Sequence, residues 1–523
     1  RSLLPAAGRR EQGTGAMTAL TRIAAANGIA AGVARVMALV ISIVLTPIIL
    51  GGIGAQLYGV LTVAGSLYDY LTLFRGGLGT AMRRHVTIAF HRGDTEGASE
   101  FYQAGFWWGA ILRMPILLMA MALAGPLCDF VRVPPELRNE AVLGMRLVLC
   151  AAWIGDFSAM FEVPVFASGA TAIISYLRSG IGLIRLIVMF AAFSLLVPSL
   201  QLYGNLLIGL TLVSTASMGI FAQRAKTVGS AIPKPRIGSP AVRRELFSYG
   251  GLALIGQLGE LLWVATDTML IGRLFGPAEI TLFSFGARWM PLLRQSWTSI
   301  LASIQPLFTK LEAENTTDRS RRATEQTVAL SAGVSVPACF VPCVVGKAFL
   351  AQWVGAEYVS AYPIILITLI PLSLELTLYP IWVVLAARGR IGWVSVAELV
   401  LATARIGASL ALAVGLSQGI LGFAWASGGA LLARNLLIRP LAVRDLDALP
   451  STARLLVFYL RAVAGAAPAL ILLWLVKPHY SNSLAAVVIA GMLGGAFALA
   501  GAISASFGRS GLLRLRKGIM SRA

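Results

Sequence analysis

Long, uninterrupted apolar segments run through almost the whole chain and constrain its fold more than any other feature. A helix needs about 20 apolar residues to cross the hydrocarbon core of a bilayer, and segments of this kind recur fourteen times in the 523 residues. They are residues 24–49, 58–80, 98–124, 140–167, 177–197, 202–222, 247–271, 279–306, 325–346, 360–386, 391–415, 418–438, 455–476 and 484–507. Such runs are too long and continuous for the alternating strands of a membrane barrel. The sequence therefore predicts an all-α polytopic membrane protein with about 14 transmembrane helices.

The composition excludes the water-soluble alternatives. Hydrophobic residues make up 57% of the chain and charged residues 13%, against about 45–50% and about 25% in soluble domains. Soluble enzymes and disordered proteins are thereby excluded. Residues 1–16 precede the first methionine, Met17, and are interpreted as an upstream mis-start or a cloning remnant. The first apolar stretch is longer than the core of a signal peptide, so we expect no cleavable signal.

The distribution of positive charge predicts the orientation of these helices. The chain has 43 Lys+Arg and a net charge of +20, and most of the basic residues fall in alternate loops and in the two tails. The intervening loops contain Arg132, Arg138, Arg273, Lys347 and Lys477. Because cytoplasmic loops are enriched in Lys and Arg, we expect a multi-pass inner (plasma) membrane protein with both termini in the cytoplasm. Topology explains the high charge, and no nucleic-acid partner is expected.

A polar, proline- and glycine-containing stretch divides the chain near its middle and reads as an inter-lobe linker. The predicted organisation is a cytoplasmic tail (1–19), an N-lobe of helices 1–6 (20–223), a cytoplasmic linker (224–245), a C-lobe of helices 7–12 (246–440), and helices 13–14 with a basic cytoplasmic tail (441–523).

Three short matches occur in the same order on the two sides of the linker. They pair Gly54–Tyr58 with Gly276–Ile280, Ala98–Glu100 with Ala323–Glu325, and Pro164–Phe166 with Pro380–Trp382. The matches indicate one duplicated six-helix unit, and thus two pseudo-symmetric lobes plus two C-terminal helices. Parallel repeats with a binding site between them are a transporter architecture.

Ten arginines lie inside the predicted spans, where each costs roughly 2.5–3.5 kcal/mol near a helix centre. They are Arg35, Arg75, Arg113, Arg146, Arg185, Arg288, Arg294, Arg405, Arg434 and Arg461. Four of them lie near helix ends and can extend to the headgroups: Arg75, Arg146, Arg434 and Arg461. Arg185 and Arg405 are borderline. The remaining four are too deep and must pair with acids or face water.

The acids available inside the spans are Asp69, Asp156, Glu162, Glu260, Asp267, Glu375 and Glu398. One interpretation is structural pairing between helices. The other is a water-filled cavity with a net positive lining, which would select an anionic passenger. The candidate cargo-binding residues are Arg35, Arg113, Arg288, Arg294 and Asn27, and the candidate cavity or coupling acids are Glu260, Asp267, Asp69 and Glu398.

Four segments carry a resemblance to a known family. They are Pro47–Gly59 (PIILGGIGAQLYG), Asp267–Gly276 (DTMLIGRLFG), Trp353–Tyr358 (WVGAEY) and Leu385–Arg390 (LAARGR). With these segments the chain resembles the multidrug/oligosaccharidyl-lipid/polysaccharide (MOP) exporter superfamily, and within it the Wzx-like polysaccharide flippases. The resemblance covers about residues 20–440.

The resemblance implies two six-helix bundles, alternating access, and export of an undecaprenyl-pyrophosphate-linked oligosaccharide for surface polysaccharide assembly. It also implies polysaccharide polymerase and chain-length machinery as partners. A lipid II flippase is the nearest alternative, because that branch also has fourteen helices and a basic cavity. A drug/cation antiporter is a third possibility, although that branch typically has an acid on helix 1, where this chain has Arg35.

No enzyme, cofactor or metal site is expected. A membrane glycan polymerase or ligase needs a sizeable catalytic segment outside the bilayer, and the predicted outer loops are short. Asp445-Leu-Asp447 matches a short metal–nucleotide motif by chance, since no nucleotide-binding fold surrounds it. The four cysteines and three histidines lack the spacing of metal ligands.

Overall fold

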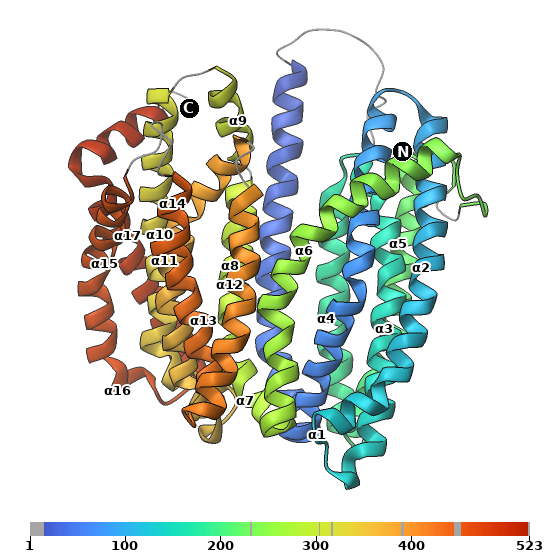
Figure 1. Ribbon diagram of the computed structural model, residues 1–523, viewed down its shortest axis with the longest axis horizontal. Coiled ribbons are helices and arrows are strands. Elements are labelled where there is room, and N and C mark those ends of the chain that lie inside the picture. The colour runs from blue at the N-terminus through green and yellow to red at the C-terminus, as the bar shows by residue number, and fades with distance from the viewer. Residues whose placement is uncertain are drawn as a thin grey trace. The chain divides into compact units, whose positions relative to one another are not determined.

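The computed structural model describes residues 15–230, 233–302, 304–314, 317–388, 392–443 and 451–520. Within these ranges it contains helices and turns and no strand (Figure 1), which confirms the all-α prediction. Eleven of the helices in the described ranges are long and apolar enough to cross a membrane. Asp445 and Asp447 lie outside the described residues.

The first helix contains the first two predicted spans. α1 runs from Gly15 to His91 and is interrupted at Gly54, which has φ 78° and ψ 167°. A residue with a Cβ cannot adopt this backbone conformation without strain, so glycine at this position allows a sharp break between two transmembrane segments.

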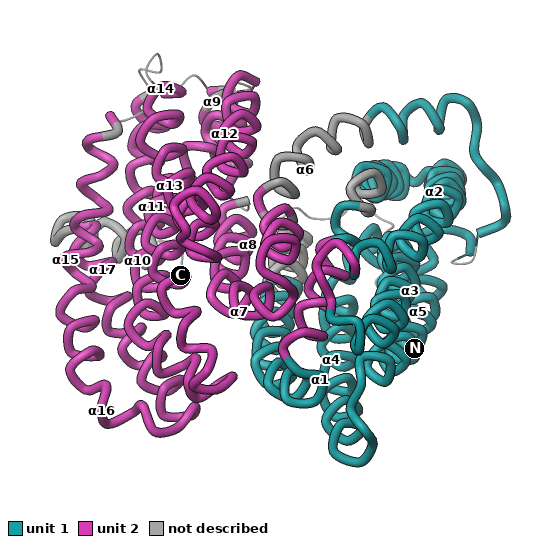
Figure 2. Tube along the Cα trace, turned by 60° about the horizontal axis from the view of Figure 1, so that its bottom comes forward, with its two compact units in different colours: residues 1–54, 67–128, 134–257 teal, residues 55–66, 129–133, 258–523 magenta. Residues whose placement is uncertain are grey.

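The chain forms two compact units (Figure 2). Unit 1 comprises residues 1–54, 67–128 and 134–257. Its further helices are α2 (Thr95–Phe130), α3 (Pro135–Ala167), α4 (Thr171–Leu195) and α5 (Leu200–Ala225). α3 and α5 pack closely because glycines let them approach: a Cβ on Gly144 would lie 2.3 Å from Leu200, and one on Gly204 would lie 2.5 Å from Leu147.

The boundary between the units falls inside a helix. α6 runs from Pro240 to Phe275, and its residues up to 257 belong to unit 1, whereas those from 258 belong to unit 2. Unit 2 also includes residues 55–66, directly after the Gly54 break, and residues 129–133. The polar linker and the first part of α6 therefore belong to the same unit as α2–α5.

The eighth predicted span, residues 279–306, is broken into two helices, α7 (Pro277–Ala287) and α8 (Trp289–Ala302), with Arg288 between them. Pro291 explains the break, because its ring has no N–H to bond the carbonyl of Ala287 and clashes with that carbonyl.

The long helices that follow in unit 2 coincide with predicted spans, whereas the two short ones, at residues 305–313 and 439–443, lie almost entirely outside them. In chain order the elements are α9 (Gln305–Ala313), α10 (Thr317–Trp353), the 3₁₀ turn η1 (Ala356–Ala361), α11 (Tyr362–Ala387), α12 (Gly392–Leu410), α13 (Leu421–Ala433) and α14 (Arg439–Val443), with π-helical turns η2 (Ala411–Gly415) and η3 (Arg434–Ile438). α11 lies at the centre and is buried over most of its length.

Two helices at the C-terminal end pack against α10. They are α15 (Thr452–Leu475) and α17 (Leu484–Met520), joined through the short α16 (Lys477–Tyr480). α15 and α17 approach each other at Gly465 and Gly501, where a Cβ on either residue would lie within 2.3 Å of the other's carbonyl oxygen. Small residues allow such contacts between helices in a bilayer.

The matched segments Gly54–Tyr58 and Gly276–Ile280 both begin at a glycine break. Gly276 has φ 93° and ψ 173°, close to the values of Gly54. After the breaks, Thr281 donates a hydrogen bond from Oγ1 to the carbonyl of Ala55 at 2.6 Å. At the corresponding place Gly59 lies so near Pro277 that a Cβ would be 1.9 Å from its carbonyl oxygen. Equivalent positions of these two matched segments thus contact each other reciprocally.

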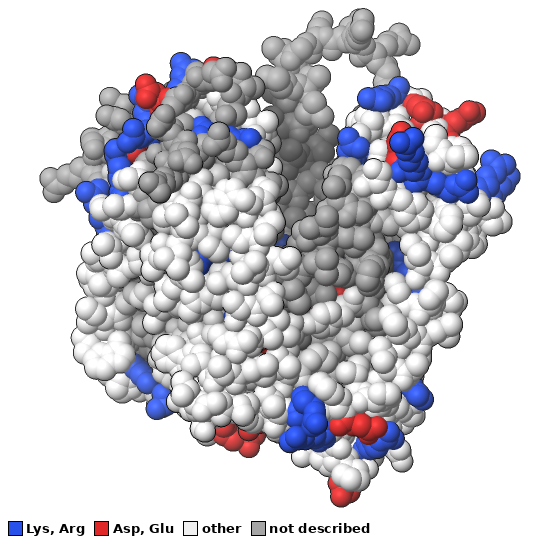
Figure 3. All heavy atoms as spheres, viewed as in Figure 1, with Lys and Arg blue, Asp and Glu red and all other residues white. Residues whose placement is uncertain are grey.

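Charged side chains gather mainly toward the ends of each unit on the face shown in Figure 3, and uncharged atoms cover most of the band between them. This pattern is the one expected for helices that cross a membrane, because exposed charges are costly at the depth of the hydrocarbon core.

Candidate functional site

The predicted site residues are distributed over both units. Asn27, Arg35, Asp69 and Arg113 belong to unit 1, and Glu260, Asp267, Arg288, Arg294 and Glu398 belong to unit 2. The side chain of Glu260 lies outside the described residues, although its backbone is part of α6.

Arg35 is exposed on the first segment of α1. It has no hydrogen bond or ion pair with any residue that the structure describes. No other described side chain covers the Arg35 guanidinium, and its neighbours Val33 and Val36 are exposed as well. Asp69 is also exposed and lies on the second segment of the same helix.

Asn27 holds α1 against the turn between α3 and α4. Its Nδ2 donates to the carbonyl of Gly169 at 2.9 Å, and its Oδ1 accepts from the backbone N–H of Ala172 at 3.0 Å. The N-cap residue of α4, Ala170, has no side-chain oxygen, so Asn27 supplies the missing cap from another helix. Both ends of its amide are occupied by this structural contact.

Arg113 lies buried between α2 and α3, with 4% of its surface exposed. Its Nε is 3.6 Å from the carboxylate of Asp156, its Nη1 contacts the sulfur of Met160 at 3.1 Å, and its charge lies 5.8 Å from the ring centre of Phe157. The indole of Trp153 donates to the backbone carbonyl of Arg113 at 3.1 Å. Arg113 is therefore neutralised inside unit 1 by an acid of the neighbouring helix.

Arg288 is surrounded by aromatic side chains. Its Nη2 donates to the hydroxyl of Tyr58 at 2.6 Å, and its guanidinium lies 5.3 Å and 5.8 Å from the ring centres of Trp353 and Phe285. Its position at the α7–α8 break results from Pro291. Aromatic faces attract a cation, so these rings help to hold the Arg288 guanidinium in its half-buried position.

Asp267 of α6 is paired inside unit 2. Arg405 of α12 contacts both carboxylate oxygens through Nη1, at 2.7 and 2.8 Å, and also the hydroxyl of Ser427 at 3.1 Å. The Arg405 side chain is fully buried. Trp263 lies beside it, with the guanidinium 5.3 Å from the ring centre. This ion pair fixes α6 to α12 and α13.

A second buried cluster is centred on Glu375 of α11. Its carboxylate receives Arg434 Nη1 at 3.3 Å, Arg439 Nη2 at 3.1 Å and Asn435 Nδ2 at 2.9 Å. Arg439 also donates to the backbone carbonyl of Glu375 at 3.1 Å and to Asn435 Oδ1 at 2.6 Å. All four side chains are almost completely buried.

Glu398 and Arg294 lie at the edge of this cluster. Glu398 of α12 is 28% exposed and lies 3.5 Å from Arg434 Nε. Arg294 of α8 is half-buried and close enough to Glu375 and Arg439 to interact with them electrostatically. Three arginines, Arg405, Arg434 and Arg439, are balanced by three carboxylates. These carboxylates are Asp267, Glu375 and Glu398. Arg294 therefore contributes an additional positive charge among the described side chains.

Sequence reasoning did not foresee the part played by Asn435 and Arg439. Residues five apart point in different directions on an α-helix, and Arg439 looked like a loop residue. The π-helical turn η3, in which the N–H of Arg439 bonds the carbonyl of Arg434, brings Arg434 and Arg439 to the same carboxylate. A local π-turn has no reliable sequence signature, although such turns occur frequently at functional sites.

The arrangement separates two kinds of arginine. One kind belongs to buried ion pairs that hold helices together: Arg113, Arg405, Arg434 and Arg439. The other kind comprises Arg35 and Arg294, which have no carboxylate within salt-bridge distance among the described side chains, and Arg288, which is held by a phenol hydroxyl and aromatic rings.

Guanidinium groups of the second kind can hold a phosphate or carboxylate through paired N–H donors. No group of three or more metal-ligating side chains occurs in the described ranges.

A family model described as "Polysaccharide biosynthesis protein" matches residues 55–363, more than half of the chain. Among individual proteins, the chain is 21% identical over 418 residues to the "uncharacterized membrane protein EpsK" of Bacillus subtilis, covering 78% of this chain and 81% of that protein.

Solved structures with a similar fold come from transporters and a flippase. A multidrug resistance MATE family transporter of the MOP superfamily, in an inward-facing conformation, gives a TM-score of 0.67 at 13% identity and covers 79% of this chain and 98% of that one. The lipid II flippase MurJ, in an inward closed conformation, gives 0.66 at 11% identity and covers 91% and 98%. The Vibrio cholerae MATE transporter VcmN, in its bent form, gives 0.53 at 18% identity and covers 83% and 100%.

Proposed function

Because the chain belongs to the polysaccharide biosynthesis protein family and has the fold of the MOP exporters, we propose that it is a flippase for an anionic lipid-linked oligosaccharide. The cargo is an oligosaccharide on undecaprenyl pyrophosphate, which alternating access moves across the inner membrane for surface polysaccharide assembly. A membrane flippase or transporter is the coarser function that the family and the similar structures support directly.

The observation that carries the proposal is that Arg35 and Arg294 have no carboxylate within salt-bridge distance among the described side chains, although Arg35 lies in an apolar part of α1 that is long enough to cross a membrane. A guanidinium without a counter-charge is costly in a membrane, and a pyrophosphate ligand compensates it with charge-assisted hydrogen bonds. Arg288, whose charge is held by aromatic rings, adds a third donor group. Asn27 and Arg113 contribute by holding the helices of unit 1 in position.

The candidate coupling acids differ in their exposure. Asp267 is committed to Arg405, whereas Glu398 is partly exposed and Asp69 is exposed. We therefore favour Glu398 and Asp69 as sites that respond to protons or cations during transport, and Asp267 as a fixed structural charge. Glu260 remains a candidate from its position on α6.

A lipid II flippase is the second candidate. The MurJ structure matches 91% of this chain, compared with 79% for the inward-facing MATE transporter. The polysaccharide biosynthesis family favours an oligosaccharide cargo over lipid II. A drug/cation antiporter is disfavoured because Arg35, a cation, occupies the first helix.

The orientation and the partners belong to the same proposal. The excess of Lys and Arg in alternate loops favours an inner-membrane protein with both termini in the cytoplasm. Polysaccharide polymerase and chain-length machinery would use the cargo after its translocation. The family and the similar structures are flippases and transporters rather than catalysts, and the proposal assigns no chemical step to this chain.

A deletion strain tests the proposal and distinguishes it from its alternatives. We expect loss of surface polysaccharide, unchanged drug susceptibility, and restoration by the wild-type gene. Single Gln substitutions at Arg35, Arg288 and Arg294 should each lower export by about tenfold or more, since a hydrogen bond to a charged group contributes roughly 1.5–3 kcal/mol. Arg461→Gln is the matched control, because Arg461 is an exposed arginine on α15 outside the proposed site.

Normal export by all three variants would contradict the proposal. Drug hypersensitivity with intact polysaccharide would identify the antiporter instead. Cell lysis on depletion, with lipid II accumulating in the cytoplasmic leaflet, would identify the lipid II flippase.

A further inference from the structure

The polar linker between α5 and α6 is not a loose tether, because its backbone is fixed to α2. We define the strap as the described residues 226–230 and 233–239, the green segment between α5 and α6 in Figure 1. Trp107 Nε1 donates to the carbonyls of Pro233 and Lys234 at 3.2 and 2.8 Å, and Trp108 Nε1 donates to the carbonyl of Ile237 at 3.1 Å. Two adjacent indoles thus hold three strap carbonyls.

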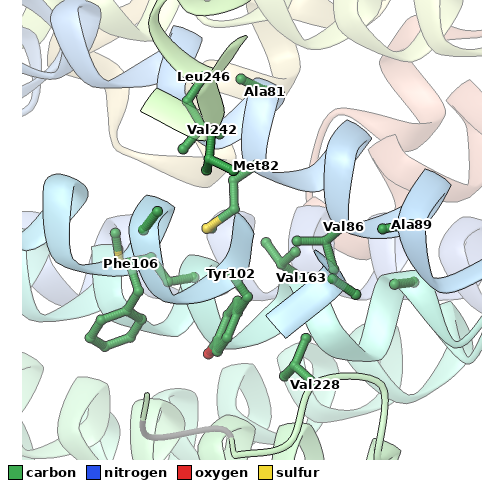
Figure 4. Close-up of a cluster of buried hydrophobic side chains, with 14 of the residues drawn as sticks. Ala81, Met82, Val86, Ala89, Tyr102, Phe106, Val163, Val228, Val242 and Leu246 are labelled. Carbon is green, nitrogen blue, oxygen red and sulfur yellow. The ribbon is translucent and has the colours of Figure 1, made fainter. Parts of the chain in front are cut away.

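Contacts at both ends of the strap add to this attachment. The N–H of Ser239 donates to Glu100 Oε1 at 2.9 Å, and Thr227 Oγ1 donates to the carbonyl of Pro164 at 3.0 Å. Val228 and, just beyond the strap, Val242 belong to the buried cluster around Tyr102 (Figure 4). The strap is therefore held from its first residues to the start of α6.

The strap and its flanks carry a concentrated positive charge. Residues 224–244 contain six basic side chains and no acid. These are Arg224, Lys226, Lys234, Arg236, Arg243 and Arg244, of which Arg243 is half-buried and the others are exposed. None of the six has a hydrogen bond or an ion pair with a described residue. Two acids lie near the strap, and both contact other groups. Glu100 accepts a hydrogen bond from the N–H of Ser239, and Glu245 contacts His85.

Apolar side chains are exposed beside these cations. Ile237, between Arg236 and Gly238, is 47% exposed, and Phe247 on α6 is 43% exposed. A rigid segment that combines fixed cations with exposed apolar side chains at the end of transmembrane helices fits the membrane–water interface.

We propose that the strap binds the headgroups of anionic phospholipids in the cytoplasmic leaflet. The choice of the cytoplasmic leaflet rests on the orientation proposed above. The binding surface itself is inferred from the charges and contacts of the strap. A basic cytoplasmic loop can attract anionic lipids without having a defined structure. Here the backbone is fixed before a lipid binds, so less conformational entropy is lost on binding, and individual lipids are retained rather than merely attracted.

Native mass spectrometry of the purified full-length protein tests this inference. Phosphatidylglycerol is titrated into detergent-solubilised protein, with phosphatidylcholine as the neutral comparison, and the affinity of each bound lipid is measured. Each basic side chain near an anionic surface contributes roughly fivefold to affinity. Replacing Lys234, Arg236 and Arg244 together by Gln should therefore weaken the tightest phosphatidylglycerol binding by about a hundredfold and leave phosphatidylcholine binding unchanged.

The matched control removes the same number of charges from unit 2. Lys310, Arg319 and Arg322 are exposed on α9 and α10, and replacing all three by Gln should leave phosphatidylglycerol affinity within about twofold of wild type. A second variant, Trp107→Phe with Trp108→Phe, keeps every cation but removes the indole donors. It should weaken the binding severalfold because the strap is then less ordered.

Equal losses in the strap variant and the control would overturn the proposal, since total charge would then explain binding. Competition by millimolar inorganic phosphate as strong as that by phosphatidylglycerol would also overturn it, because the site would then recognise a free anion. Selective loss in the strap variant, with little competition by phosphate, would support it. These readouts do not depend on which cargo the protein transports.

Discussion

At the scale of single residues, the arginines in the membrane spans differ in what balances their charge. Arg405 is paired with Asp267 within unit 2, and Arg113 is paired with Asp156 within unit 1. Both pairs join neighbouring helices. Arg35 has no carboxylate partner among the described side chains. The ion pairs stabilise the packing of the helices. In the proposed function, the arginines without a carboxylate at salt-bridge distance select an anionic cargo.

The Asp267–Arg405 pair gives a direct stability test. Asp267→Asn leaves a fully buried guanidinium without its counter-charge, which should lower the free energy of unfolding by about 3–5 kcal/mol. The double variant Asp267→Leu with Arg405→Met replaces the pair by apolar side chains and should recover most of this loss. Thermal unfolding in detergent measures both, and an unchanged melting temperature for Asp267→Asn would contradict a structural role for the pair.

His85 gives a pH dependence outside the membrane spans. It stacks on Phe101 at 4.8 Å and lies 3.3 Å from Glu245. Burial lowers the pKa of His85 below 6.5, Arg84 lowers it further, and Glu245 partly opposes the shift. The unfolded chain therefore takes up a proton more readily, so the contribution of His85 to stability is complete above about pH 6.5 and is lost as the pH falls below it.

Melting temperatures at pH 7.5 and pH 5.5 check this expectation. His85→Gln should reduce the difference between the two pH values, and His91→Gln, an exposed histidine on the same helix, should not. An equal pH dependence in wild type and His85→Gln would show that other groups control stability in this range.

At the scale of helices, three local breaks in regular structure shape the protein. Gly54 and Gly276 interrupt the helices at corresponding places of the two repeats, with nearly the same backbone angles. Pro291 divides one predicted span and leaves Arg288 at the junction. The π-helical turn η3 brings two arginines to Glu375. Each break positions a group that a continuous helix would place elsewhere.

The close contact at Gly59 is testable with a control in the same segment. A Cβ on Gly59 would lie 1.9 Å from the carbonyl oxygen of Pro277, whereas one on Gly65 would meet no atom within 4 Å. Gly59→Ala should lower the free energy of unfolding by about 1–3 kcal/mol because the helices must separate. Gly65→Ala should be neutral or slightly stabilising. Equal melting temperatures for the two variants would contradict the observed packing.

Much of the helical architecture was predictable from the sequence, and the site was predictable only in part. Apolar runs of about 20 residues located the helices, and the Gly54–Tyr58 and Gly276–Ile280 matches pointed to two places where glycine breaks a helix with similar backbone angles. Pro291 could have been recognised as a helix break in advance. The role of Arg439 could not, because an α-helical period places it away from Arg434 and only the π-turn brings them together. The attachment of the linker to Trp107 likewise depends on tertiary contacts.

At the scale of the whole molecule, the proposed function links the charge of the cargo to the membrane potential. Moving an anion out of an inside-negative cell is favourable by about 2.3 kcal/mol per charge per 100 mV. Imposing an inside-negative potential on proteoliposomes should therefore accelerate outward movement of a pyrophosphate-linked cargo. A rate independent of the potential would show that the charge does not cross the field in the rate-limiting step.

The central claim is that guanidinium groups in the membrane spans hold the pyrophosphate of a lipid-linked oligosaccharide while it crosses the bilayer. It is tested most directly in proteoliposomes loaded with a fluorescent undecaprenyl-pyrophosphate oligosaccharide, in which lectin accessibility at the outer surface reports translocation. We predict rapid translocation by the wild-type protein and by Arg461→Gln, and a loss of about a thousandfold in the variant with Gln at Arg35, Arg288 and Arg294. Translocation by the folded triple variant at the wild-type rate would contradict the account.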